Sequence, residues 1–143
     1  MNVETILAGK GREVLTISPD ADIAEAVQVL ETRGVGAVVV SADGKAVDGI
    51  LSERDIIRGL AKHGEGLLNR PVDALMTRDV ETCTGGDTDR EVLALMTHGR
   101  FRHLPVVEDG VLTGIVSIGD VVKSRLDGIA SEAEAMRDYI SRG

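Results

Sequence analysis

An internal repeat constrains the fold of this chain more than any other feature of its sequence. When the sequence is aligned with itself at a spacing of 66 residues, matching residues recur over a long stretch that includes Thr16 with Thr82. One residue then drops out of the second copy, and at a spacing of 65 residues GILSERD at 49–55 matches GIVSIGD at 114–120. Two copies are too few to stack as a solenoid, so we expect them to face each other.

Hydrophobic periodicity predicts the same order of elements, β-α-β-β-α, in both copies. Asp22 with Glu25, and Thr88 with Glu91, fit the capping-box pattern at the start of the first helix of each copy. The expected strands lie at 14–17, 37–40, 47–51, 80–83, 104–107 and 112–116, and the closing helices at 53–62 and 118–126. The predicted fold class is therefore α/β, of the α+β kind, with two β-α-β-β-α units.

The remaining segments predict the boundaries of these units. We expect an N-terminal segment and the first unit over 1–63, a linker at 64–70, the second unit over 71–127 and a C-terminal helix over 128–143. Short flanking helices are expected at 3–7, 71–76 and 130–140.

Composition narrows the classes of partner. Hydrophobic residues make up 43% of the chain and aromatic residues only 1%, so aliphatic side chains must build the core. The formal net charge of −8 argues against nucleic acid, whose phosphates need a basic face. A single cysteine, Cys83, on a predicted buried strand is expected to be a core residue. The chain contains neither a signal-peptide pattern nor a long apolar run, so we expect a cytoplasmic protein that does not bind a membrane.

The motif G-I-x-S-x-x-D, which occurs once in each copy, is the most informative pattern. Ser52 with Asp55, and Ser117 with Asp120, fit the first turn of a helix, where the serine caps backbone N–H groups and the aspartate favours the helix dipole. The same geometry suits a nucleotide, because a helix N-terminus attracts phosphate and a carboxylate accepts ribose hydroxyls. The glycine that begins each motif allows a ligand to approach the backbone or marks a bulge.

A basic run, RFRH at 100–103, is a second candidate for ligand contact. Strand alternation sends Arg102 to one side and Phe101 and His103 to the other, so one side faces a ligand or the run is a solvated edge over a buried Phe101. Arg54 and Arg58, one helical turn apart, are either phosphate ligands or exposed helix residues. The GKG stretch at 9–11 lacks the spacing of a P-loop and is interpreted as a turn.

Two β-α-β-β-α units that each end in G-I-x-S-x-x-D resemble a tandem pair of CBS motifs, also called a Bateman module. The resemblance extends over nearly the whole chain, including VLTISPDADIAEAV, SERDIIR, PVDALMT, FRHLPVVEDG and SIGDVVK. It implies that the two motifs pack through their sheets about a pseudo-two-fold axis. It also implies two clefts that bind AMP, ADP, ATP, S-adenosylmethionine or NAD(H) as regulatory ligands, with no cofactor required.

The resemblance assigns residues to these clefts. The aspartates are expected to bind ribose, the serines to lie near ribose or phosphate, and the threonines to frame adenine. One cleft would be lined by Thr16, Arg102, His103, Ser117 and Asp120, with Arg102 and His103 near phosphate, and the other by Thr82, Gly36, Ala37, Ser52 and Asp55. Gly85 stands where Pro19 leads us to expect a proline, which predicts a looser loop and leaves occupancy of one cleft or two open.

These features predict a regulatory, ligand-sensing module that modulates a partner protein in trans. The alternative is a structural dimerisation module whose clefts stay empty. We expect no enzyme and no metal site, because His63, His98 and His103 have no ligand partners at metal spacing and the chain has no hydrolase triad pattern. The resemblance also implies a homodimer that pairs through apolar helix faces. The last helix, whose apolar residues have helical spacing, either adds to this surface or packs across a cleft. The residues expected on these faces are Ile56, Ile57, Leu60, Val121, Val122, Ile129, Ala133, Met136 and Ile140.

Overall fold

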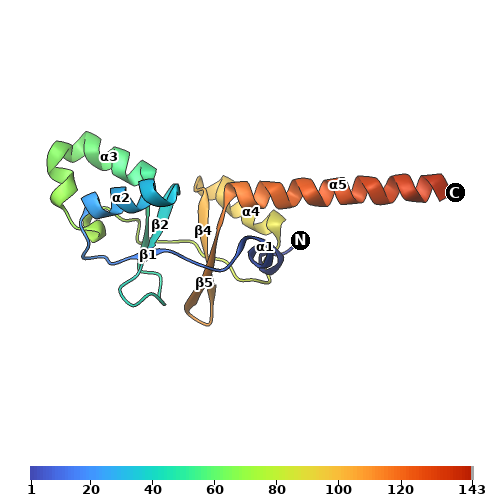
Figure 1. Cartoon of the computed structure of the whole chain (residues 1–143), viewed down its shortest axis with the longest axis horizontal. Helices are drawn as coiled ribbons and strands as arrows, with labels where there is room; N and C mark the ends of the chain where they lie inside the picture. Colours follow the sequence, from blue (N-terminus) through green and yellow to red (C-terminus); the bar gives the residue numbers. More distant parts are fainter. Residues whose placement is uncertain (143) are drawn as a thin grey trace.

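A computed structural model describes residues 1–142 and places the two copies of the repeat side by side, each as a small sheet with its helices (Figure 1). The first copy contains β1 (Thr16–Ile17), α2 (Ile23–Arg33), β2 (Ala37–Val40), β3 (Gly49–Ser52) and α3 (Glu53–His63). The second contains α4 (Asp89–Gly99), β4 (His103–Glu108), β5 (Val111–Ser117) and α5 (Ile118–Arg142). The predicted mixed fold of helices and strands is confirmed.

The strand registers of the two copies are equivalent. In the first hairpin Ala37 pairs with Ser52, and in the second His103 pairs with Ser117. β1 pairs parallel with β2, whereas the predicted strand at 80–83 is reduced to a single bridge between Cys83 and Val106. Extending that bridge toward residue 81 would require a backbone N–H from Pro105, and proline has none.

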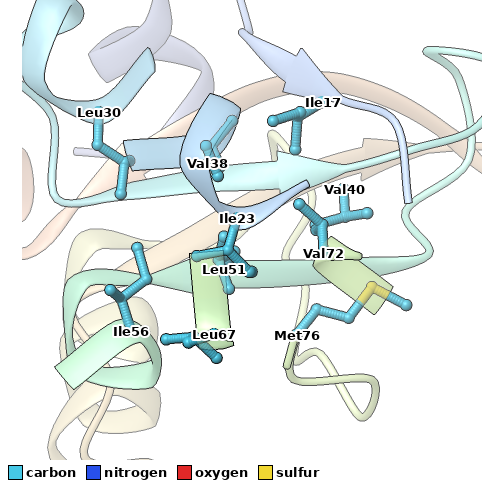
Figure 2. Close-up of a cluster of buried hydrophobic side chains, with 11 residues drawn as sticks. Ile17, Ile23, Leu30, Val38, Val40, Leu51, Ile56, Leu67, Val72 and Met76 are labelled. Carbon is cyan, nitrogen blue, oxygen red and sulfur yellow. The ribbon is translucent and has the colours of Figure 1, made fainter. Parts of the chain in front are cut away.

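Each copy has its own apolar core. Figure 2 shows the first, in which strand and helix side chains meet Leu67, Val72 and Met76. Leu67 belongs to a 3-10 helix, η1 (Gly64–Asn69), and is fully buried. The segment predicted as a linker is therefore packed against the first core. It leads into a second 3-10 turn, η2 (Val72–Ala74), where a short helix at 71–76 was expected.

The two copies exchange the segments that precede them. The helix α1 (Val3–Lys10) packs into the second core, whereas residues 71–76, which lead into the second copy, pack into the first core. Equivalent backbone bonds hold both: Val3 N–H donates to Asp87 O at 2.9 Å, and Val72 N–H donates to Ala21 O at 2.7 Å. Each core is therefore completed by a segment from elsewhere in the chain.

The glycine at the start of each G-I-x-S-x-x-D motif makes room for these exchanged segments. A Cβ on Gly114 would lie 2.7 Å from Leu7 Cδ2. A Cβ on Gly49 would lie 2.7 Å from Met76 Sδ and 2.8 Å from the backbone oxygen of Thr77. The close approach that requires glycine is thus made by the chain itself.

α5 runs without interruption from Ile118 to Arg142 and extends far beyond the rest of the molecule (Figure 1). The prediction of separate helices at 118–126 and 130–140 is wrong. Gly128, between them, lowers helix stability by about 1 kcal/mol relative to alanine, which does not break a helix rich in Ala, Glu, Arg and Met. Residue 143, the last of the predicted C-terminal segment, lies outside the described residues.

The apolar helix faces expected at a dimer surface differ in exposure. Ile56 and Val121 are buried in the two cores, so the expectation that they lie on an outer face is wrong. Ile57, Leu60 and Val122, on the same two helices, are exposed. Within residues 1–142, no helix has the length and apolar character needed to cross a membrane.

Candidate functional site

Both G-I-x-S-x-x-D motifs form the first turn of a helix with the same geometry. Ser52 Oγ accepts from Asp55 N–H at 3.2 Å, and Asp55 Oδ2 accepts from Ser52 N–H at 3.0 Å. The corresponding distances for Ser117 and Asp120 are 3.2 and 2.9 Å. The capping function of these residues is thus observed at both sites. At each site the aspartate accepts the cap hydrogen bond through Oδ2, so the cap does not use Oδ1.

The exchanged segments each bring one polar side chain to one aspartate. Lys10 Nζ donates to Asp120 Oδ2 at 2.7 Å and to Ile115 O at 2.9 Å. Thr77 Oγ1 donates to Asp55 Oδ1 at 3.4 Å. The two sites therefore share their cap geometry but differ in charge, since only the Asp120 site has an ammonium group in contact with the carboxylate.

Lys10 was not recognised as a site residue from the sequence, where the GKG stretch was interpreted as a turn. It is the last residue of α1, and the fold of that helix onto the second core carries its side chain to Asp120. A second internal similarity could have revealed this: Val3 and Leu7 match Val72 and Met76 at a spacing of 69 residues. That pattern predicts equivalent packing of the two segments.

The surroundings of Asp120 favour its ionised form. Partial burial raises the pKa of Asp120, but the hydrogen bonds from Lys10 and from the Ser117 backbone, with the charge of Lys10, outweigh burial and lower the pKa below its ordinary value. The carboxylate is therefore an acceptor at neutral pH, as binding to a pair of ribose hydroxyls requires.

His103 lies where the two copies meet. Its Cε1 would be 3.3 Å from a Cβ on Gly36, and the carboxylate carbon of Glu53 would be 3.6 Å from the same point. Burial lowers the pKa of His103 and outweighs the opposing effect of Glu53, with Lys10 and Arg102 acting in the same direction as burial. Gly36 and His103, which were assigned to different clefts, are thus neighbours at the junction of the two copies.

Two arginines of the expected set have different environments. Arg54 Nη1 donates to Arg100 O at 3.3 Å, so this side chain reaches from α3 to the end of α4. The side chain of Arg102 is exposed, while its carbonyl accepts from Ile118 N–H at 2.8 Å and fixes the start of α5 beside β4. Phe101 is half-buried against the second core, which agrees with the alternative in which RFRH at 100–103 is a solvated edge over Phe101.

The expected adenine-framing residues lie at the first strand of each copy. Thr16 is half-buried and pairs with Val39, and Thr82 is exposed beside the buried Cys83. Ala37, at the start of β2, is buried and pairs with Ser52. The arrangement therefore offers two capped helix starts, each with a carboxylate, and one of them with nearby cationic groups.

Comparison with known proteins decides the family. The CBS domain family matches residues 10–62 and 72–127, which together make up most of the chain. This chain belongs to the CBS domain family. The crystal structure of the CBS-domain containing protein ATU1752 from Agrobacterium tumefaciens is similar, with 46% identity and a TM-score of 0.84 over 87% of this chain and 99% of that chain.

Two similar solved structures contain ligands. The CBS domain pair of protein MJ0100, solved in complex with 5-methylthioadenosine and S-adenosyl-L-methionine, shares 26% identity with a TM-score of 0.76 over 90% of this chain and 96% of that chain. The CBS domain protein PAE2072 from Pyrobaculum aerophilum, complexed with AMP, shares 26% identity with a TM-score of 0.74 over 84% of this chain and 89% of that chain. CBS pairs of this fold thus include proteins that bind adenosine-type ligands.

The loop of the second CBS motif that contains Gly85 is held firmly, contrary to the expectation that glycine would loosen it. Gly85 N–H donates to Glu108 Oε1 at 2.6 Å, and Gly85 O accepts from Glu4 N–H at 3.0 Å. A Cβ at Gly85 would lie 2.9 Å from Glu4 Oε2. α1 therefore covers this loop and replaces the restraint that a proline would supply.

The single cysteine of the CBS pair is a residue of the second core. Cys83 is buried, and burial, with Asp87 and Glu108 nearby, raises the pKa of its thiol to about 12. The thiol is therefore protonated at neutral pH and unreactive, as expected for a core cysteine. Residues 1–142 contain no cluster of three or more His, Cys, Asp or Glu side chains that could hold a metal ion.

Proposed function

We propose that this CBS pair is a regulatory module that binds adenine nucleotides between its motifs and, when occupied, modulates a partner protein. The observation that carries the proposal is the repeated helix start in which a capped, ionisable carboxylate stands beside a serine, at Asp55 and at Asp120. At Asp120 a vicinal diol can donate to Oδ1, which accepts neither the cap bond nor the Lys10 bond, whereas at Asp55 it replaces or shares the long bond from the Thr77 hydroxyl to Oδ1. The complexes of PAE2072 with AMP and of MJ0100 with adenosyl compounds support this ligand class.

The difference in charge between the two sites favours different ligands. Lys10 contacts Asp120, and His103 and Arg102 contribute to the electrostatic environment of the same region, so a ligand with phosphate groups suits this site. The site at Asp55 has the neutral Thr77 hydroxyl in the place of an ammonium group. We propose that AMP, ADP, ATP or NAD(H) prefers the Asp120 site, and that the positively charged S-adenosylmethionine is disfavoured there.

The proposal includes three further properties. The ligand is bound without turnover, because it acts by favouring one conformation over another and needs no bond broken. Two copies of the chain pair through exposed helix faces, which include Ile57, Leu60 and Val122. The protein acts in the cytoplasm on a partner protein.

The first test is thermal unfolding with AMP, ADP, ATP, S-adenosylmethionine, NAD and NADH at about 1 mM each. A ligand at 100 times its dissociation constant adds about 2.7 kcal/mol to the free energy of unfolding, which gives a clear rise in Tm. Asp55→Asn and Asp120→Asn retain an oxygen that can accept the cap hydrogen bond and remove the charge. We expect Asp120→Asn to abolish the shift with phosphorylated ligands while the Tm of the free protein changes little.

The second candidate function, a structural dimerisation module with empty clefts, is favoured by the cap hydrogen bonds themselves. If it is correct, none of the six ligands raises the Tm. In that case substitution of both aspartates with alanine lowers the Tm by loss of the caps, at about 1 kcal/mol for each cap. Isothermal titration calorimetry with AMP provides an independent measurement, and heat of binding that survives in the doubly substituted protein would contradict our assignment of the aspartates.

A further inference from the structure

The second half of α5 has an apolar stripe with no partner in its own chain. Residues 129–142 are all exposed, and α5 extends away from both cores in this region (Figure 1). Leu126, Ile129, Met136 and Ile140 are 61%, 51%, 60% and 69% exposed. Isolated apolar side chains are ordinary on a surface, but here they share one side of a long, projecting helix.

The spacing of this stripe is that of a coiled coil. Its positions follow one another at intervals of four, three, four, three and four residues, which places them at alternating d and a positions of a heptad repeat. The positions are Val122, Leu126, Ile129, Ala133, Met136 and Ile140. They span 122–140, about 28 Å of helix at 1.5 Å per residue.

We propose that α5 pairs with α5 of a second copy of this chain as a parallel, in-register, two-stranded coiled coil. This inference deepens the pairing of copies included in the proposed function and rests on that pairing, but it does not depend on nucleotide binding. A second copy is the partner for two reasons. The apolar stripe is complementary to a copy of itself, and the charged residues beside the stripe pair with those of a second α5.

The flanking charges select the parallel orientation. With Leu126, Ala133 and Ile140 at position a, Glu132 is at position g and Arg137 at position e of the next heptad. In a parallel pair, g of one helix lies beside the following e of the other, so Glu132 meets Arg137 of the second copy twice. In an antiparallel pair g lies beside g and e beside e, which opposes Glu132 to itself and Lys123 to Arg137.

Contacts within the chain limit the number of strands. Val121 and Ser124 of α5 are buried, and Ser124 Oγ donates to Asp89 Oδ2 of α4 at 2.9 Å. Arg125, at position g of the first heptad, lies 3.8 Å from Asp89 Oδ1. α4 of the same chain therefore covers the g position at this end of the stripe. Coiled coils of three or four helices bury the residues on both sides of the stripe, so this contact favours two helices.

A pair of charge-adding variants tests whether the stripe is the interface. Ile129→Asp places a carboxylate on the stripe, and Ser131→Asp, the matched control, places one on the opposite face of the same turn. Both residues are exposed in the single chain, so neither change disturbs its core. By sedimentation equilibrium at 1 to 100 μM, we expect wild type and Ser131→Asp to be dimers and Ile129→Asp to dissociate at least a hundredfold more readily.

Each other outcome has a distinct meaning. A dimer that persists in Ile129→Asp overturns the coiled coil and leaves pairing through another face. A monomeric wild type overturns both the coiled coil and the pairing of copies. A trimer or tetramer overturns the two-stranded form. The rise in Tm with AMP is recorded for the same variants and reports on nucleotide binding separately.

Charge exchange tests the orientation. Glu132→Arg and Arg137→Glu each create like-charge contacts in a parallel homodimer, whereas an equal mixture of the two variants restores opposite charges at both contacts. We expect each variant alone to be weakened at least fivefold at low salt and the mixture to form heterodimers of near wild-type affinity. Equal weakening of the mixture would overturn the parallel orientation. As a second readout, Ile140→Cys is expected to form an interchain disulfide under mild oxidation, and Asp138→Cys, on the opposite face, is not.

Discussion

At the scale of single residues, the contact of Lys10 with Asp120 makes one site of the CBS pair responsive to ligand charge. The ammonium group lies 2.7 Å from the carboxylate in the free protein. A ribose can bind Asp120 through Oδ1, which accepts neither the Lys10 bond nor the cap bond, and a phosphate on the same ligand can then bind the ammonium group. Lys10 thus offers a nucleotide an interaction that a neutral nucleoside lacks.

Replacement of Lys10 with methionine is therefore expected to change ligand preference more than stability. Lys10→Met should reduce the ratio of AMP affinity to adenosine affinity about tenfold, the effect of one charge-assisted hydrogen bond. The free energy of unfolding should fall by only about 0.5 kcal/mol, because both side chains of the ion pair are partly exposed. Calorimetric titration with both ligands measures the ratio, and Lys62→Met on α3 is the control for loss of a lysine.

His103 makes a pH-dependent contribution to stability. Since burial lowers its pKa in the folded protein, the unfolded chain takes up a proton first as the pH falls below about 6.5. The free energy of unfolding therefore decreases from about pH 6.5 down to the lower pKa of the folded protein. We expect His103→Gln to reduce this loss, measured as Tm between pH 7.5 and 5.

His98→Gln, at an exposed position on α4, is the matched control for loss of an imidazole. An NMR titration of the imidazole Cε1–H of His103 gives its pKa directly. A value above 6.5 in the folded protein would contradict the burial of this side chain against Gly36 and Glu53.

At the scale of elements, the exchanged segments depend on the two glycines that they cover. Gly114→Ala should destabilise the protein by about 1–3 kcal/mol, because its Cβ would overlap the Leu7 side chain. In a double-mutant cycle, Leu7→Ala should relieve at least 1 kcal/mol of that cost. Urea unfolding of the four proteins measures the coupling.

The equivalent cycle in the first CBS motif has a different expected result. A Cβ at Gly49 would also lie 2.8 Å from the backbone oxygen of Thr77, which truncation of Met76 does not remove. Met76→Ala should therefore relieve little of the cost of Gly49→Ala. Equal relief in the two motifs would show that only side chains limit the space at these glycines.

The hairpins and helices of the repeat were predicted from the sequence, whereas the reduced strand at 80–83 and the packing of the segments outside the repeat were not. Apolar strands around an Asp-Gly turn identify the hairpins, and the caps Asp22, Ser52 and Thr88 identify the starts of α2, α3 and α4, because these signals are local. The packing of Leu67 and the backbone partners of α1 depend on contacts distant in sequence, which no local pattern encodes. For the same reason the paired Ser and Asp residues were found as candidates, while Lys10 was missed.

At the scale of the whole molecule, the exchange of segments makes the two CBS motifs mutually dependent. Val3 and Leu7 are buried in the second core, and Val72 and Met76 lie in the first. We expect the two halves to unfold in a single cooperative transition. Hydrogen exchange of β2 and β4 amides, followed by NMR, should give the same free energy of opening for both strands.

A cut between the halves should leave the molecule assembled. A protease site inserted at the exposed Gly66 would separate residues 1–66 from the rest, yet each fragment holds a segment buried in the core of the other. After cleavage we expect both fragments to elute together in size-exclusion chromatography without denaturant. Residues 77–143 expressed alone should not fold, because Val3, Ile6 and Leu7 are missing from their core. Separate elution of two folded fragments would contradict this interdependence.

The same exchange of segments imposes an order on folding while the chain is being synthesised at the ribosome. The first core cannot close until Met76 has emerged, and α1, which is made before either core, has no place to pack until β4 and β5 have been made. Its apolar residues Val3, Ile6 and Leu7 must therefore wait, uncovered, while most of the chain is translated. A segment made before either core is thus among the last to find its final contacts, and during that interval the nascent chain depends on its surroundings to remain unaggregated.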